Sequence, residues 1–142
     1  MSPHQLFSFA NALALTAWLG LLFLPHVAAI RNVIAAAVIP CLFAAAYVVI
    51  LARFFEPGGF AKFSTLEGIA SLQSSPWLLL AGWLHYLAFD LFVGAWEVRT
   101  ARRDGIAHLA IVPSLILTFI VGPAGLLAFT VTRLLLRKRQ GG

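Results

Sequence analysis

Two ionisable side chains, His85 and Asp90, lie within an apolar stretch of the sequence. They belong to residues 82–90, which read GWLHYLAFD. A charged side chain at the centre of a membrane-spanning helix costs about 2.5–3.5 kcal/mol on insertion scales, so such residues are usually retained for a function. Asp90 is therefore the first candidate for a group that donates and accepts protons in a reaction. The alternative is a structural acid that is hydrogen-bonded to a neighbouring helix.

Helical periodicity sorts the surrounding residues into two faces, since successive side chains are separated by about 100°. One face carries two carboxylates and a small residue, in the order Trp83, Tyr86, Asp90, Gly94, Glu97. The other face lies about 140° away and carries an imidazole among aromatic rings, in the order His85, Phe89, Phe92, Trp96. Gly94 leaves space beside Asp90 for a ligand, a water molecule or a neighbouring helix.

Two further residues join the candidate catalytic set. Glu97 lies at the boundary of the apolar stretch, where water can reach it, and His108 begins the next apolar segment. Neutral imidazole can act as a base or a ligand. The candidate catalytic residues are Asp90, His85, Glu97 and His108. For both histidines a purely structural role remains the alternative.

A metal ion is an open alternative, and its ligands would come from Glu67, His85, Asp90, Glu97 and His108. Metal-binding helices usually carry a closely spaced signature such as Glu-x-x-His. His85 and Asp90 are five residues apart and do not share a face, and Glu67 is equally suited to capping a helix. No nucleotide-binding or nucleophile-elbow motif is present in the sequence. We therefore predict no cofactor.

The elements that must position these residues are membrane-spanning helices. Of the 142 residues, 61% are hydrophobic and 11% are charged, against about 25% charged in soluble domains. Four apolar segments, residues 6–24, 33–55, 77–96 and 109–136, are each long enough to cross a hydrocarbon core of about 30 Å as a helix. We predict an all-α integral membrane protein, a single domain over residues 1–142 that forms a four-helix transmembrane bundle.

The fourth apolar segment contains a helix-breaking sequence, TFIVGPAG, at residues 118–125. The ring of Pro123 clashes with the carbonyl of Phe119, which predicts a kinked fourth helix with the kink between Thr118 and Pro123. Such breaks are tolerated where they face protein or a cavity. Thr118 and Gly122 are therefore candidate ligand-facing residues, and close packing of helices through small residues is the alternative.

The connecting segments and the charges bear on location. Ser64 and Glu67 fit a capping box, which predicts a short interfacial helix over residues 65–71.

With four spans, six Lys and Arg residues lie on the side of the termini and four on the other side, which predicts both termini in the cytoplasm, in a bacterial inner membrane. A cleaved signal peptide is the alternative for the first segment. The net charge of +5 comes from residues at the ends of apolar runs, which favours lipid head groups over nucleic acid as partners.

The polar residues of the third and fourth segments form a pattern that resembles a known family. The pattern reads GW-x-HYL-x-FDLF-x-G-x-WE over residues 82–97, R-x-x-GI-x-H over residues 102–108, and P-x-x-x-LTF-x-x-GP-x-GL over residues 113–126. LEGI at residues 66–69 also fits. The sequence resembles the abscisic-acid-deficient-four-like family, whose plant members are plastid membrane proteins required to make neoxanthin from violaxanthin. A short chain without a plastid transit peptide is expected to be a bacterial relative.

The resemblance implies an isomerase-type reaction on a long isoprenoid. Opening the epoxide of violaxanthin to an allenic alcohol changes no oxidation state, but it requires removal of a proton from the polyene and an acid at the epoxide oxygen. Asp90 and His85 would perform this chemistry, supported by Glu97 and His108. The expected substrate-binding residues are Trp83, Tyr86, Phe89, Phe92, Thr118 and Gly122.

Two alternatives of other functional classes remain open. One is a non-catalytic carotenoid- or retinoid-binding membrane protein, accessory to a soluble enzyme. The other is a small proton-coupled transporter, which the lack of inverted-repeat symmetry disfavours. The expected partners are the lipid bilayer and a hydrophobic polyene or isoprenoid, with a homo-oligomer as an open alternative and no nucleic acid.

Overall fold

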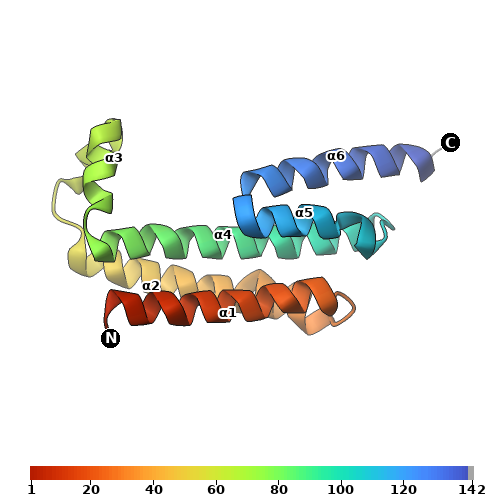
Figure 1. Ribbon diagram of the computed structural model, residues 1–142, viewed down its shortest axis with the longest axis horizontal. Coiled ribbons are helices and arrows are strands. Elements are labelled where there is room, and N and C mark those ends of the chain that lie inside the picture. The colour runs from red at the N-terminus through yellow and green to blue at the C-terminus, as the bar shows by residue number, and fades with distance from the viewer. Residues whose placement is uncertain (141–142) are drawn as a thin grey trace.

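The computed structural model describes the backbone of residues 1–140 and the side chains of residues 1–136 (Figure 1). Every regular element in residues 1–140 is helical, as predicted. Three helical segments are long and apolar enough to cross a membrane: α1 (Pro3–Phe23), the continuous segment Ile30–Phe54, and α4 (Pro76–Arg103). These three segments correspond to the first three predicted spans, and α4 extends beyond the predicted end at residue 96.

The fourth apolar segment is not a single span. It forms α5 (His108–Val121) and α6 (Pro123–Gln140), which pack against each other as a hairpin (Figure 1). Gly122 makes the turn with φ +45°, and Pro123 starts α6, where no backbone N–H is needed. With 14 residues, α5 is about 21 Å long, shorter than a hydrocarbon core of about 30 Å. The break was predicted at the correct place, but the four-helix bundle with a kinked fourth helix is corrected to three long helices and a hairpin.

The hairpin also changes where the chain ends. The N-terminus lies at one end of the molecule, whereas the end of α6 lies at the other, beside the α1–α2 and α4–α5 connections (Figure 1). The prediction that both termini lie on one side of the membrane assumed four complete spans. The arrangement differs from that assumption, because α6 returns to the end from which α5 started.

The second long segment changes its helical type along its length. Residues Ile30–Val38 form the π-helix η1, which continues into α2 (Ile39–Phe54). Pro40 follows this junction, and a proline ring cannot fit against the carbonyl four residues earlier in a regular α-helix. A wider turn before Pro40 accommodates that constraint.

The connection between α2 and α4 holds two short helices, η2 (Gly59–Ser64) and α3 (Leu66–Gln73). The short helix predicted over residues 65–71 is present as α3, but its cap differs from the predicted one. Thr65 is the N-cap residue, and its Oγ1 accepts a hydrogen bond from the N–H of Gly68 at 3.1 Å. Ser64 instead donates to the carbonyl of Ala61, because α3 begins one residue later than the capping box implied.

Helix α4 is the centre of the molecule, and it packs against α1, α2, η1 and the hairpin. Its buried residues include Leu84, Leu91, Ala95 and Val98, which belong to one apolar core shared with α1 and α5. The hairpin is only half as long as α4 and covers the C-terminal half of α4 (Figure 1). The residues that α4 carries at mid-length therefore lie at the tip of the hairpin.

Candidate active site at the hairpin tip

Asp90 lies halfway along α4 and faces the turn of the hairpin. It follows Pro76 by about 21 Å of helix. A Cβ placed on Gly122 would come within 2.8 Å of Oδ1 of Asp90, so the backbone of the turn lies directly on the carboxylate. Within the described residues, the buried Oδ2 of Asp90 has no hydrogen-bond partner. An unpaired polar oxygen in an apolar interior is energetically costly.

Tyr86 is the polar neighbour of Asp90 and lies one turn earlier on α4. Its hydroxyl donates a hydrogen bond to the carbonyl oxygen of Ile120 at 3.3 Å and interacts with the carboxyl group of Asp90. Ile120 belongs to the last turn of α5, where carbonyl groups have no partner within the helix. Tyr86 therefore connects the middle of α4 to the tip of the hairpin.

Glu97 forms a second carboxyl site two turns further along α4. Its side chain is fully buried, and its Oε1 accepts a hydrogen bond from Oγ1 of Thr118 at 2.9 Å. The hydroxyl of Thr118 also lies 3.0 Å from the carbonyl oxygen of Ser114. Oε2 of Glu97 is buried without a hydrogen-bond partner among the described residues. Thr118 thus holds the hairpin to α4 and does not face a cavity, which agrees with the packing alternative.

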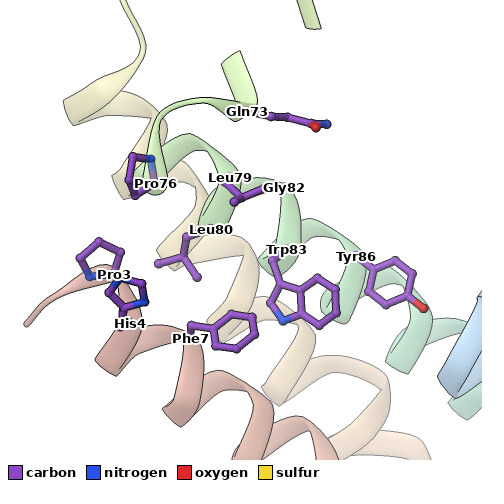
Figure 2. Close-up of a pocket in the computed structure, with 10 residues that line it drawn as sticks. All are labelled: Pro3, His4, Phe7, Gln73, Pro76, Leu79, Leu80, Gly82, Trp83 and Tyr86. Carbon is purple, nitrogen blue, oxygen red and sulfur yellow. The ribbon is translucent and has the colours of Figure 1, made fainter. Parts of the chain in front are cut away.

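An open groove runs along α1 and α4 up to Tyr86, with a volume of about 540 Å³ (Figure 2). Its walls are mainly apolar and include Phe7, Leu79 and Trp83, while His4 and Gln73 also line it. Figure 2 shows Tyr86 at the end of the groove that is nearest to the hairpin. The groove is the part of α1 and α4 that the short hairpin leaves uncovered.

A hydrogen bond crosses from α4 to α1 beside the groove. Nε1 of Trp83 donates to Oδ1 of Asn11 at 2.9 Å. The indole ring lies between the rings of Phe7 and Tyr86, with centroid distances of 5.6 Å and 5.3 Å. Trp83 and Tyr86 therefore contribute aromatic rings to the wall of the groove. Asn11 was visible in the sequence as a polar interruption of the first span, but its partner was not.

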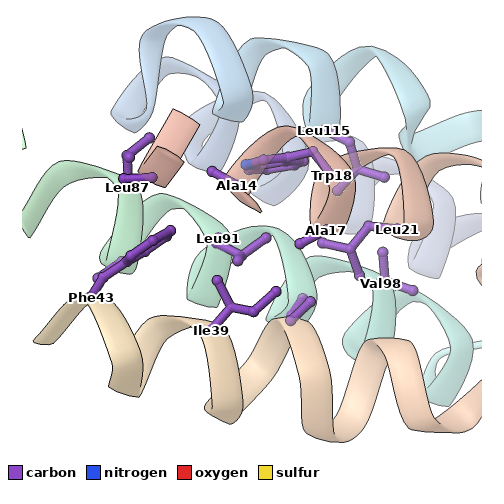
Figure 3. Packing of buried hydrophobic residues seen from close by; sticks show 14 of the residues in the cluster. Ala14, Ala17, Trp18, Leu21, Ile39, Phe43, Leu87, Leu91, Val98 and Leu115 are labelled. Atoms are coloured by element: carbon purple, nitrogen blue, oxygen red, sulfur yellow. The ribbon is translucent and has the colours of Figure 1, made fainter. Parts of the chain in front are cut away.

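Trp18 of α1 fills the space that Gly94 leaves on α4. A Cβ on Gly94 would come within 2.4 Å of the indole ring, and Trp18 is 2% exposed. Figure 3 shows the ring between α4 and Leu115 of α5, and it also lies 5.5 Å from the ring of Phe119. Of the three occupants considered for this space, the structure places a neighbouring helix there.

Neither of the two predicted histidines, His85 and His108, lies beside Asp90 in the structure. His85 packs against the rings of Tyr47 and Phe89, at 5.9 Å and 4.6 Å, on the other face of α4. Nε2 of His108 donates to the carbonyl of Leu22 at 2.9 Å, at the start of α5, about 15 Å along the helix from Thr118. As expected from the helical periodicity, His85 and Asp90 lie on different faces of α4, and the polar neighbour of Asp90 is Tyr86.

Other predicted site residues also lie apart from the groove. Phe89 and Phe92 are 59% and 47% exposed and do not line it. Glu67 is exposed on α3, near the opposite end of α4 from His108. No three His, Cys, Asp or Glu residues within the described part of the chain lie close enough together to hold a metal ion. The five predicted metal ligands are therefore dispersed over the molecule.

An ion pair that the sequence did not reveal anchors the base of the hairpin. Nε of Arg133 on α6 lies 2.5 Å from Oδ2 of Asp104, which follows α4, and the Asp104 side chain is 8% exposed. Arg103 adds a longer contact of 3.5 Å to the same carboxylate. This pair fixes α6 against the α4–α5 connection, and the Thr118–Glu97 hydrogen bond fixes the middle of α5.

Comparison with known proteins identifies one family. The model of the family described as ABA DEFICIENT 4-like matches residues 5–129. The matched region contains α1, the second span, α4, α5 and the tip of the hairpin with Asp90 and Tyr86. No curated protein and no solved structure gives a significant match to the chain.

Proposed function

Because the chain belongs to the ABA DEFICIENT 4-like family, we propose that it is a membrane-embedded enzyme that moves a proton on a carotenoid or related isoprenoid. Family membership is consistent with a carotenoid-related role. The observation that carries the proposal is the position of Asp90. Its carboxyl group, with Oδ2 unpaired among the described residues, lies at mid-depth beside Tyr86, and Tyr86 lines the inner end of an apolar groove.

The groove suits a long, apolar and unsaturated substrate. Its polar atoms are few, and the rings of Phe7, Trp83 and Tyr86 follow one another along it. Flat rings pack well against a polyene because they bury a large apolar area. A substrate that lies along this groove places one end at the hydroxyl of Tyr86. Asp90 lies one helical turn further along α4.

The chemistry that these two residues support is a redox-neutral isomerisation of a polyene epoxide, as in the conversion of violaxanthin to neoxanthin. The protonated Asp90 gives its proton to the epoxide oxygen as the carbon–oxygen bond breaks. The resulting carboxylate then takes a proton from the polyene as the allene forms. Asp90 ends in the state in which it began, so no co-reactant is consumed. Tyr86, whose hydroxyl donates to Ile120 and interacts with the carboxyl group of Asp90, orients that carboxyl group toward the epoxide.

A non-catalytic polyene-binding protein is the rival proposal, and the same open groove favours it. The two differ in what Asp90 does. A binding protein needs the aromatic walls of the groove but no acid beyond them, whereas an isomerase needs both. The proposals therefore diverge when Asp90 is changed without altering the shape of its side chain.

The test is expression in a bacterium that makes an epoxidised carotenoid, followed by chromatography of the extracted pigments. Asp90→Asn is nearly isosteric and is expected to lower conversion by about 100-fold or more, at equal amounts of protein in the membrane. His85→Gln changes the other polar residue of the same helix, and we expect it to keep conversion. Full conversion by Asp90→Asn would exclude the acid/base role, and loss of conversion only in His85→Gln would return the role to His85.

A further inference from the structure

We propose that the substrate enters the groove from the membrane leaflet that faces away from the cytoplasm. The identity of the substrate rests on the proposed function, whereas the direction of entry rests on three other observations. These are the distribution of charge between the two ends of the molecule, the end at which the groove lies, and the contacts that close its inner end.

Positive charge is concentrated at one end of the molecule. This end contains the α1–α2 connection, the α4–α5 connection and the end of α6 (Figure 1). Eight of the ten Lys and Arg residues lie in these segments or in the last turns of α4 next to them: Arg31, Arg99, Arg102, Arg103, Arg133, Arg137, Lys138 and Arg139. The acid beside them is Asp104, which makes the net charge of this end +7 (eight positive, one negative).

The opposite end is electrically balanced. It contains the N-terminus and the α2–α4 connection, with Arg53 and Lys62 against Glu56 and Glu67. Positively charged segments next to membrane spans are retained in the cytoplasm. Eight against two is a strong bias, and it places the end of α6 in the cytoplasm and the N-terminus outside. The hairpin creates this bias, because four complete spans would divide the same residues six to four.

The groove belongs to the balanced end. His4 is in the first turn of α1, Gln73 ends α3, and Pro76 starts α4, so all three lie at the end of the molecule that holds the N-terminus and the α2–α4 connection. From the level of Pro76 the groove leads about 15 Å along α4 to Tyr86. The site therefore opens sideways to the outer leaflet, and the reacting group of the substrate reaches mid-depth.

The hairpin closes the other half of α4. The hydrogen bond from Tyr86 to the carbonyl of Ile120 and the ion pair between Asp104 and Arg133 hold it in place. The ring of Trp18 fills the space over Gly94 beneath it. A ligand from the cytoplasmic leaflet would have to displace these contacts, whereas a ligand from the outer leaflet meets an open groove.

The first part of the test measures orientation by labelling with a membrane-impermeant maleimide in intact bacterial cells. The single cysteine is replaced by Cys41→Ala, and Ala61→Cys in η2 or Ala107→Cys before α5 is added. Both positions are exposed. We expect Ala61→Cys to react in intact cells and Ala107→Cys to react only after permeabilisation. Labelling of Ala107→Cys in intact cells would overturn the proposal.

The second part blocks the groove from outside. Gln73→Cys, labelled in intact cells with a bulky impermeant maleimide, is expected to lose at least nine-tenths of pigment conversion. Labelled Ala61→Cys, which lies at the same end but outside the groove, is the matched control and should convert normally. Normal conversion by labelled Gln73→Cys would overturn entry through the groove. If the wild type converts no pigment, the proposed function fails. The labelling experiment still decides the orientation of the protein. Entry through the groove is then decided by whether labelled Gln73→Cys retains less polyene after purification than labelled Ala61→Cys.

Discussion

Replacing Gly125 by alanine is expected to displace the tip of the hairpin and to slow the reaction. A Cβ on Gly125 would lie 2.0 Å from the backbone nitrogen of Thr118 and 2.1 Å from its Oγ1. Since such contacts are not tolerated below about 3.0 Å, α6 must move away from α5 by about 1 Å. Overpacking of this kind costs about 1–3 kcal/mol. The hydrogen bond from Thr118 to Glu97 then lengthens, and the turn at Gly122 moves away from Asp90.

A displacement of about 1 Å in the positioning of reacting groups can lower a rate by about 100-fold. We therefore expect Gly125→Ala to insert into the membrane but to convert pigment about 100-fold more slowly in the chromatographic assay. The matched control is Ala124→Val, which adds methyl groups one residue earlier, where the side chain is exposed. If Gly125→Ala converts pigment at the wild-type rate, the close packing of α5 and α6 does not position the residues around Asp90.

Three further predictions concern contacts that hold the site together, and thermal unfolding in detergent micelles measures each. Asp104→Asn should lower the free energy of unfolding by about 1–2 kcal/mol, because it removes the charge that Arg133 contacts at 2.5 Å. Exchanging the two residues, with arginine at position 104 and aspartate at position 133, should recover part of the lost free energy of unfolding. The absence of any recovery would argue against a direct ion pair. Gly94→Ala should cost about 1–3 kcal/mol against the ring of Trp18, so an unchanged midpoint would contradict the packing described. Trp83→Phe removes a hydrogen bond to α1 and should cost about 1 kcal/mol. If Trp83→Phe lowers the free energy of unfolding equally in a variant that already lacks the Asn11 side chain, the hydrogen bond is not the cause of the loss.

The sequence allowed the inward orientation of Asp90 and the position of the helix break to be predicted because both are local signals. An acid within an apolar run is conspicuous, and a proline that follows a glycine interrupts a helix whatever surrounds it. The shared face of Tyr86, Asp90 and Glu97 also followed from helical periodicity alone. These features need no knowledge of the neighbouring helices.

The reversal at Gly122 could not be predicted in the same way. A break leaves the direction of the next helix open, and contacts between distant residues decide it. Those contacts are the ion pair of Asp104 with Arg133 and the hydrogen bond of Thr118 to Glu97. The partner of each face of α4 depends on the same arrangement. His85 therefore faces α2 and not the acid, and the groove exists only because the hairpin is short.

We propose that Asp90 moves a proton in a reaction that changes no oxidation state. The most direct test incubates purified wild-type protein and the Asp90→Asn variant with an epoxidised polyene, and follows the product by chromatography and mass. We expect a new pigment of unchanged mass from the wild type, and we expect the variant to retain the polyene but to convert it at least about 100-fold more slowly. Conversion by the variant at the wild-type rate, or a product that differs in mass by hydrogen or oxygen, would exclude this role of Asp90.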